Sequence, residues 1–169
     1  MVHKYKGLRF GNIVLFSEYG VRCMDVRADG EIVGDIVIPN EFDGKPVFEI
    51  DYCGFNMQTK MTSVKLPDGL KKISACAFDN CIGLTEIVIP DGVTVIEKFA
   101  FENCYNLKSV VIGKSVKEIG HHAFYQCHDL TSFTFNGTVA EWNLIEKADR
   151  FALGSHVEKV VCLDGEADL

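Results

Sequence analysis

Residues 84–106, LTEIVIPDGVTVIEKFAFENCYN, contain the pattern that decides the fold. In the segment 86–89, apolar residues bound for the interior alternate with residues that face outward, which is the period of a half-buried β-strand. The Pro-Asp-Gly segment at 90–92 ends that strand, because proline cannot continue the ladder and glycine permits a tight turn. The segment 100–104 then has apolar residues at a spacing of three, which suits a short helical or 3₁₀ turn.

The same pattern recurs at intervals of 23 residues on both sides of this stretch. Several columns of similar residues stay in phase over about 80 residues, as they do in repeat architectures. The columns are Phe55, Phe78, Phe101 and Phe124; Ile50, Ile73, Ile96 and Ile119; Met61, Leu84, Leu107 and Leu130; and Cys81, Cys104 and Cys127. Because one unit cannot bury its apolar edge alone, the pattern predicts a β-rich, right-handed solenoid of mutually dependent coils.

The repeat predicts a single domain over residues 1–169. We expect about four repeats between 36 and 135, the first of them lengthened by an insertion. The end coils of a solenoid would expose their core, so the segments 1–35 and 136–169 are predicted to be caps.

The N-terminal cap is predicted to be a β-hairpin. Apolar and polar residues alternate in 8–16 and in 21–26, and the Ser-Glu-Tyr-Gly segment at 17–20 between them favours a turn. We expect this hairpin to continue the sheet of the repeats.

The C-terminal cap is predicted to contain a helix and a strand. Thr138 and Glu141 have the spacing of a capping box, which marks a helix N-terminus. Apolar residues at helical spacing then predict a helix over 139–148 that lays Trp142 over the last coil, followed by a strand over 157–162.

These columns resemble the BspA-type, or Treponema pallidum-type, leucine-rich repeat, L-x-x-L-x-L-P-x-x-L-x-x-I-x-x-x-A-F-x-x-C-x-x. Residues 84–106 fit it almost letter for letter, the units that begin at 61 and 107 fit nearly as well, and a degenerate unit occupies about 36–60. The resemblance implies a leucine-rich-repeat fold in which parallel strands line one curved face. It also implies a bacterial surface, adhesion or interaction module, although the fold alone does not determine function.

Net charge and hydropathy disfavour some classes of partner and bear on the cellular location of the protein. The net charge of −7 disfavours binding to nucleic acid and to anionic lipid. No apolar run reaches the roughly 20 residues that membrane insertion needs, and the first residues do not resemble a secretory signal. We therefore expect a cytoplasmic protein, with a secreted or cell-surface location as the alternative if a signal has been removed.

The seven cysteines are predicted to be mostly free thiols. An odd number cannot pair completely within one chain, and the CxxC spacing of zinc and redox sites is absent. The column of Cys81, Cys104 and Cys127 is expected to pack inside the solenoid. Cys53 and Cys76 share a second column, which continues as Phe99 and His122 and is expected at the edge of the core, with packing favoured over a disulfide.

The sequence predicts no catalytic residue, no metal ligand and no cofactor. His121, His122, Cys127 and His128 are close in sequence, but Cys127 belongs to the core and the two adjacent histidines are expected to point in different directions, whereas a structural zinc site needs converging ligands. Neither a G-x-S-x-G elbow nor a phosphate-binding glycine loop occurs. An unrecognised metal-binding or hydrolytic site assembled at the caps is the disfavoured alternative.

Two surfaces are candidates for binding a partner. On the strand face, outward positions fall in columns, and an apolar centre with a polar rim is a common interface design. The candidate residues there are Lys65, Glu86, Val88, Lys108, Val111 and Thr134. On the opposite turns, the aromatic candidates are Phe99, Tyr105, Tyr125 and His128. For each surface, plain structural packing is the alternative reading.

The sequence therefore predicts a noncatalytic module that binds a protein partner through a rigid repeat surface. A cell-surface adhesin that binds host protein or glycan is the alternative.

Overall fold

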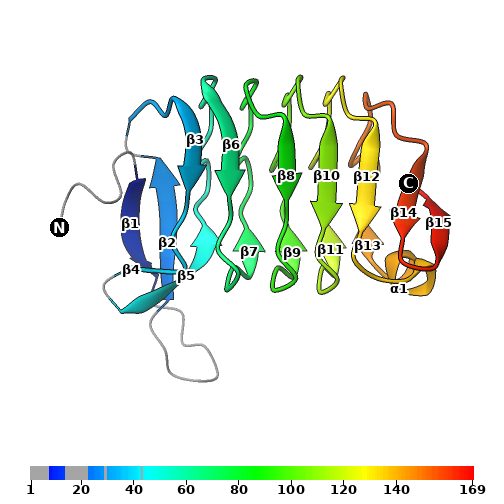
Figure 1. Cartoon of the computed structure of the whole chain (residues 1–169), viewed down its shortest axis with the longest axis horizontal. Helices are drawn as coiled ribbons and strands as arrows, with labels where there is room; N and C mark the ends of the chain where they lie inside the picture. The colour runs from blue at the N-terminus through cyan, green and yellow to red at the C-terminus, as the bar shows by residue number, and fades with distance from the viewer. Residues whose placement is uncertain (1–7, 14–22, 29, 43) are drawn as a thin grey trace.

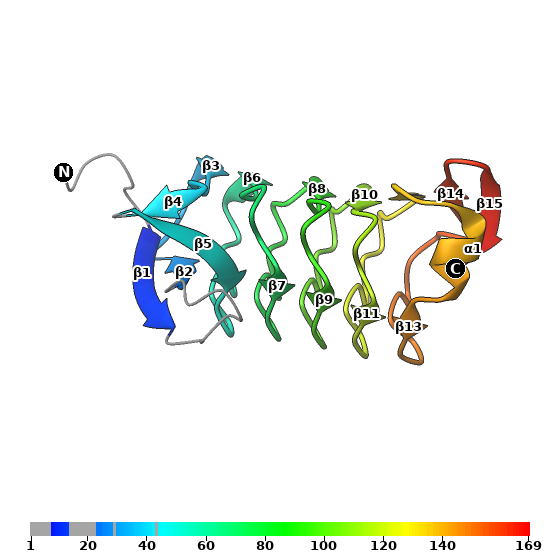
Figure 2. The ribbon, with the colours of Figure 1, turned by 90° about the horizontal axis from the view of Figure 1, so that it is seen from below.

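The computed structural model describes residues 8–13, 23–28, 30–42 and 44–169. The chain forms a β-solenoid whose coils stack along the long axis, with β1 (Leu8–Ile13) and β2 (Cys23–Ala28) at one end of the stack and β14 (Lys159–Cys162) and β15 (Gly165–Asp168) at the other (Figure 1). Seen from below, each coil of the central part passes through two sheets that line different sides of the molecule (Figure 2). The predicted repeat solenoid is thus confirmed.

The front sheet carries the longer strand of each coil after the first. Its five-stranded part has the order β15-β14-β12-β10-β8, and the parallel pair of β3 and β6 lies beside β8 (Figure 1). The bounds are β3 Gly34–Val37, β6 Met61–Lys65, β8 Glu86–Val88, β10 Ser109–Ile112, β12 Ser132–Phe135, β14 Lys159–Cys162 and β15 Gly165–Asp168.

The second sheet was not predicted as a separate layer. It is built mainly from two-residue strands in the order β1-β2-β5-β7-β9-β11-β13, with β4 paired to β5. The bounds are β1 Leu8–Ile13, β2 Cys23–Ala28, β4 Glu41–Phe42, β5 Lys45–Ile50, β7 Lys72–Ile73, β9 Val95–Ile96, β11 Glu118–Ile119 and β13 Glu146–Lys147. The insertion in the first coil forms the antiparallel β4–β5 pair.

The core between the two sheets superposes equivalent side chains of successive coils. The rings of Phe55, Phe78, Phe101 and Phe124 are fully buried, and each neighbouring pair is stacked with centroids 5.1 Å apart. The predicted burial of Cys81, Cys104 and Cys127 is also confirmed, because all three are fully buried. Coil stacking therefore supplies most of the apolar burial that stabilises the fold.

The segments that lead from the second sheet back to the front sheet form the predicted short turns of 3₁₀ type and do not continue as a helix. Hydrogen bonds from residue i+3 to residue i close them, as from Ala77 N to Ser74 O and from Cys81 N to Phe78 O, which is the 3₁₀ pattern. Two residues per coil, however, adopt left-handed backbone conformations, for example Cys76 with φ 56° and Asn80 with φ 58°. These conformations keep the turns from continuing as a helix.

The N-terminal hairpin prediction is confirmed where the structure describes it. β1 and β2 pair antiparallel, from Leu8 with Ala28 to Ile13 with Cys23, and β2 continues the second sheet by pairing in parallel with β5. The predicted turn at 17–20 lies outside the described residues.

The predicted helix over 139–148 is too long. α1 spans only Val139–Asn143, although the predicted capping box of Thr138 and Glu141 is present. Beyond it, the backbone N–H groups of Glu146 and Ala148 donate to Lys117 O and Ile119 O, so the chain joins the second sheet as β13. Covering the edge of β11 satisfies backbone groups that a longer helix would leave unpaired.

The C-terminal strand is confirmed as β14, but it is followed by an unpredicted partner, β15. The two pair antiparallel, and Trp142 packs beneath them with its indole N–H donating to Asp168 O at 2.9 Å. Within the described residues, no helix is both long and apolar enough to cross a bilayer.

Glycine at 113 is required by the close approach of neighbouring coils. A Cβ at Gly113 would lie 2.4 Å from the carbonyl oxygen of Pro90 in the preceding coil, whereas a Cβ at Gly69 would meet nothing within 4 Å. We expect Gly113→Ala to lower the free energy of unfolding by about 1–3 kcal/mol, because the backbones must move apart. Gly69→Ala should leave stability unchanged within about 1 kcal/mol. Urea titrations of the two variants check this, and equal midpoints would contradict it.

Candidate interaction surfaces

The predicted strand-face columns are present on the front sheet. Ser109 pairs with Glu86 and Ser132, and Val111 pairs with Val88 and Thr134. On β6, Lys65 pairs with Val37 of β3. The predicted residues Lys65, Glu86, Val88, Val111 and Thr134 therefore face outward from the same sheet, and exposed Lys108 directly precedes β10.

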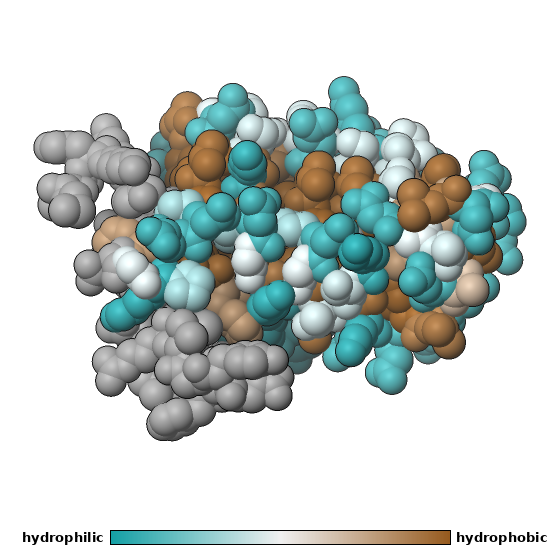
Figure 3. Space-filling view, turned by 60° about the horizontal axis from the view of Figure 1, so that its bottom comes forward, coloured by the Kyte–Doolittle hydropathy of each residue, from teal (hydrophilic) through white to brown (hydrophobic). Residues whose placement is uncertain are grey.

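One of these columns contains four valines, with Lys65 paired to the first of them and Thr134 between the last two. Val88 is 57% exposed, Val37 is 63% exposed and Val161 is 49% exposed. Val111, which lies next to Val88, is half-buried. Val161 extends the column because it pairs with Thr134. We call Val37, Val88, Val111 and Val161 the valine strip. In Figure 3, an interrupted band of apolar side chains follows the long axis between polar ones.

Val37 and Val161 were not among the predicted binding residues. The signal was present in the sequence, because Val37 lies between Ile36 and Ile38 in the same strand pattern that places Val88 between Ile87 and Ile89. The longer first coil obscured the equivalence of Val37, since its spacing from the next unit is not 23 residues.

A groove of about 410 Å³ lies beside the valine strip, where the sheet changes from β6 to β8. Val88 and Pro90 form one apolar wall, and Lys65, Asp68 and Glu86 bring charged groups to it. An apolar side chain of a partner would meet hydrocarbon here, with charges of both signs at the rim.

The predicted aromatic edge separates into two groups. Phe99 and Tyr125 lie on either side of His122, with ring centroids 5.6 Å and 4.2 Å from it, and both are half-buried. Tyr105 stacks on His128 at 5.5 Å. No ring contact between described residues joins the groups, and the half-buried rings cover the edge of the coils.

The expectation that His121 and His122 point in different directions is wrong. Their ring centroids lie 3.8 Å apart, and His122 Nδ1 lies 3.9 Å from Glu102 Oε1. Burial, followed by the nearby His121 and Arg150, lowers the pKa of His122. In the part of the chain that the structure describes, no three histidine, cysteine or acidic side chains are arranged to hold a metal ion.

The buried cysteine column is chemically inert. Cys81, Cys104 and Cys127 each donate the thiol hydrogen to the carbonyl of a phenylalanine in the preceding coil, at 3.0–3.2 Å. Burial raises the pKa of Cys81 and of Cys127 to about 12. Because the thiolate is the reactive form, these three side chains serve packing and hydrogen bonding.

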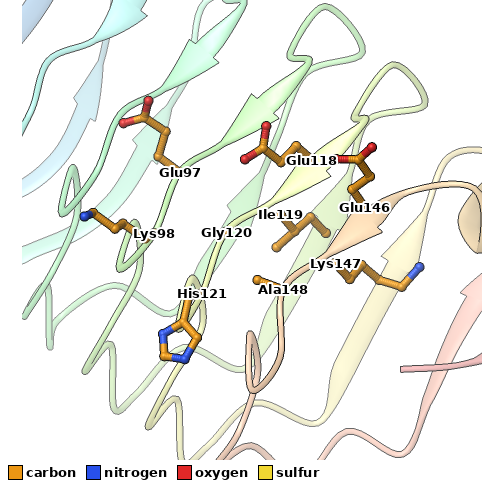
Figure 4. Close-up of a pocket in the computed structure, with 9 residues that line it drawn as sticks. All are labelled: Glu97, Lys98, Glu118, Ile119, Gly120, His121, Glu146, Lys147 and Ala148. Atoms are coloured by element: carbon orange, nitrogen blue, oxygen red, sulfur yellow. The ribbon is translucent and has the colours of Figure 1, made fainter.

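The outer side of the second sheet carries an acidic groove of about 730 Å³ (Figure 4). The carboxylates of Glu97, Glu118 and Glu146 come from successive coils and point toward the same side of it. Glu97 is held by Lys72 at 2.9 Å and accepts a hydrogen bond from Ala75 N. This groove could not be predicted from the sequence, because several of its residues belong to two-residue strands that show no alternating pattern.

Stacked coils with phenylalanine and leucine columns and two terminal caps define a leucine-rich-repeat solenoid. The chain belongs to the BspA-type leucine-rich-repeat family, because the family model described as "BspA type Leucine rich repeat region" matches residues 35–145 in six copies. The resemblance inferred from the sequence is thereby confirmed.

Solved structures of other repeat proteins share this architecture. The chain is 26% identical to a leucine-rich repeat protein from Bacteroides ovatus ATCC 8483, with a TM-score of 0.66, over 90% of this chain but only 39% of that one. It is also 26% identical to the T. pallidum leucine-rich repeat protein, with a TM-score of 0.58, over 93% of this chain and 83% of that one.

A leucine rich cell surface protein from Faecalibacterium prausnitzii A2-165 matches with 21% identity and a TM-score of 0.57, over 77% of this chain and 39% of that one, and this shows the fold alone. The comparison with curated proteins finds no match.

Proposed function

We propose that the protein is a noncatalytic interaction module that binds a partner protein on the valine strip. The observation that carries the proposal is that one column of the front sheet holds four valines from separate strands, three of them exposed. Membership of a repeat family built for display of such faces supports it.

The valine strip has the energetic properties of a binding surface. Burying each exposed valine under a partner contributes roughly 1–2 kcal/mol. The strands that carry the strip are held by pairing with neighbouring strands, so little conformational entropy is lost when the partner binds. The flanking hydroxyls and charges stay hydrated at the rim, where they favour one orientation of the partner.

The partner that fits this surface is a protein presenting aliphatic or aromatic side chains in an extended row. Glycans need planes of aromatic rings and directed hydrogen bonds, whereas the strip offers β-branched aliphatic groups. One apolar side chain of the partner would occupy the groove between β6 and β8, in contact with Val88 and Pro90.

A double variant tests the strip. Val88→Glu/Val111→Glu places two charges at its centre without touching the core and is expected to weaken partner binding by at least about tenfold, because apolar burial is lost and carboxylates are desolvated. The measurement is quantitative cross-linking from a photoreactive residue at position 37, compared between wild type and variant in native cells.

The matched control is Leu144→Glu/Leu153→Glu, which adds the same charge at exposed apolar residues away from the strip. It should leave the cross-linked partner unchanged. Equal capture by wild type and by the folded Val88→Glu/Val111→Glu variant would refute the proposal, as would cross-links only to a second copy of this chain.

A further inference from the structure

Cys53 and Cys76 differ from the other cysteines of the repeats. They occupy equivalent positions of adjacent coils, 23 residues apart, and both are half-buried free thiols. The buried column of Cys81, Cys104 and Cys127 is instead fully enclosed and hydrogen-bonded to carbonyls. Among the described cysteines of the repeats, the pair at the edge is therefore the more accessible to reagents in solution.

The backbone holds the two residues at a separation that suits a disulfide. Cys53 N donates to Ala75 O at 3.0 Å, so the segments run side by side. Two residues further on, the stacked rings of Phe55 and Phe78 give a coil spacing of 5.1 Å. Disulfides join residues whose Cα atoms are about 4.4–6.8 Å apart. Both cysteines share a left-handed backbone conformation, with φ of 52° and 56°, and their thiols lie within hydrogen-bonding reach of one another.

The chemistry of the surroundings assigns different roles to the two thiols. Burial, followed by interaction with the Cys53 thiol and then by Asp79 and Glu102, raises the pKa of Cys76 to about 11. Cys76 is thus almost entirely protonated at neutral pH and is a poor first nucleophile. Cys53 instead adjoins Tyr52, which is 65% exposed and whose pKa is raised by its hydrogen bond and charge interaction with Cys53.

We propose that Cys53 and Cys76 form an inter-coil disulfide by exchange with a low-molecular-weight disulfide such as oxidised glutathione. The Cys53 thiolate attacks one glutathione sulfur, forms a mixed disulfide and releases the first glutathione as thiolate. Cys76 then gives up its proton and attacks the Cys53 sulfur, which releases the second glutathione. In balance, two protein thiols are oxidised and one glutathione disulfide is reduced to two thiols.

The product is a covalent link between the first two coils. It closes a loop of 23 residues in the unfolded chain, which restricts that chain and raises the melting temperature by about 5 °C. Strongly oxidising disulfides owe their lability to a stabilised thiolate in the reduced form, and Cys76 has no such stabilisation. The link is therefore expected to persist once it has formed.

The test treats the folded full chain with oxidised glutathione and follows it by intact mass and by peptide mapping without reduction. Wild type is expected to lose two hydrogen atoms and to yield one linked peptide pair that contains Cys53 and Cys76. Cys76→Ser is expected to retain one glutathionyl group on Cys53. Cys53→Ser is expected to acquire a glutathionyl group on Cys76 at least about tenfold more slowly, because Cys76 is protonated.

Far-UV circular dichroism before oxidation shows that each variant is folded. The proposal would be overturned if the wild-type protein kept all its thiols, or if it accumulated a stable mixed disulfide as Cys76→Ser does. A link that uses any other cysteine would overturn it as well. A melting temperature that rises on oxidation in wild type, but in neither variant, supports it independently of the mass measurement.

Discussion

Replacing Phe101 by alanine is expected to lower the free energy of unfolding by about 3–5 kcal/mol. Its ring is fully buried and stacked on both faces, by Phe78 and by Phe124, each at 5.1 Å. Removing it leaves a cavity that the two flanking coils cannot fill, because their positions are fixed by the strands of both sheets. In a solenoid, the loss also weakens the coupling between the halves on either side.

Urea titration followed by far-UV circular dichroism measures this loss. Tyr105→Ala is the control, because it removes an aromatic ring from the same coil at a position that is 40% exposed, and it should cost less than about 1 kcal/mol. Phe101→Leu should fall between the two, since leucine refills part of the space. If the Phe101→Ala and Tyr105→Ala midpoints coincide, ring stacking is not what holds the coils together.

The buried columns could be predicted from the sequence because each records a contact with the next coil. A phenylalanine placed every 23 residues must meet its equivalents once coils of equal length stack, whatever the details of the turns. The same logic located the outward valines at Val88 and Val111, whose neighbours on the sheet are the equivalents one repeat away. Periodicity therefore predicted the contacts between coils and the faces of the front strands.

Periodicity could not predict features that depend on which strands a segment pairs with in the folded molecule. β7, β9 and β11 are two residues long, too short to show an alternating pattern, and their pairing defines the second sheet. The helix predicted over 139–148 ends early for the same reason, because Glu146 and Lys147 pair with β11. The helical spacing of Trp142 and Ile145 is real, but both are buried by different neighbours.

The cysteine and histidine clusters also combine one feature that periodicity predicted with one that it could not. The column that contains Cys53 and Cys76 was predicted at the core edge, and both residues are half-buried there. The close approach of the His121 and His122 rings was not predictable, because it depends on the left-handed backbone conformation of His122, with φ of 58°. The same conformation recurs in this column at Cys53, Cys76 and Phe99, but these residue types do not mark a left-handed backbone in the sequence as glycine or asparagine would.

Replacing Trp142 by alanine is expected to lower the free energy of unfolding by about 3–5 kcal/mol. The indole is fully buried, contacts Phe133 and Phe135 with centroids 5.8 Å and 5.5 Å away, and donates to Asp168 O. Lys147 Nζ lies 4.7 Å from the ring centroid, and burial lowers the pKa of that lysine. The indole thus connects the helix, the last front strands and β13.

The larger consequence of Trp142→Ala concerns the end of the solenoid. Without the indole, the aromatic side chains of β12 lose their cover and become exposed apolar surface, as an uncapped terminal coil would. We therefore expect increased binding of a hydrophobic dye and concentration-dependent association in light scattering, in addition to the shifted urea midpoint. Leu144→Ala is the control, because Leu144 lies in the same cap but is 82% exposed, and it should change neither readout. A Trp142→Ala protein that is destabilised but remains monomeric and binds no dye would show that Trp142 only fills space, and that another element closes the stack.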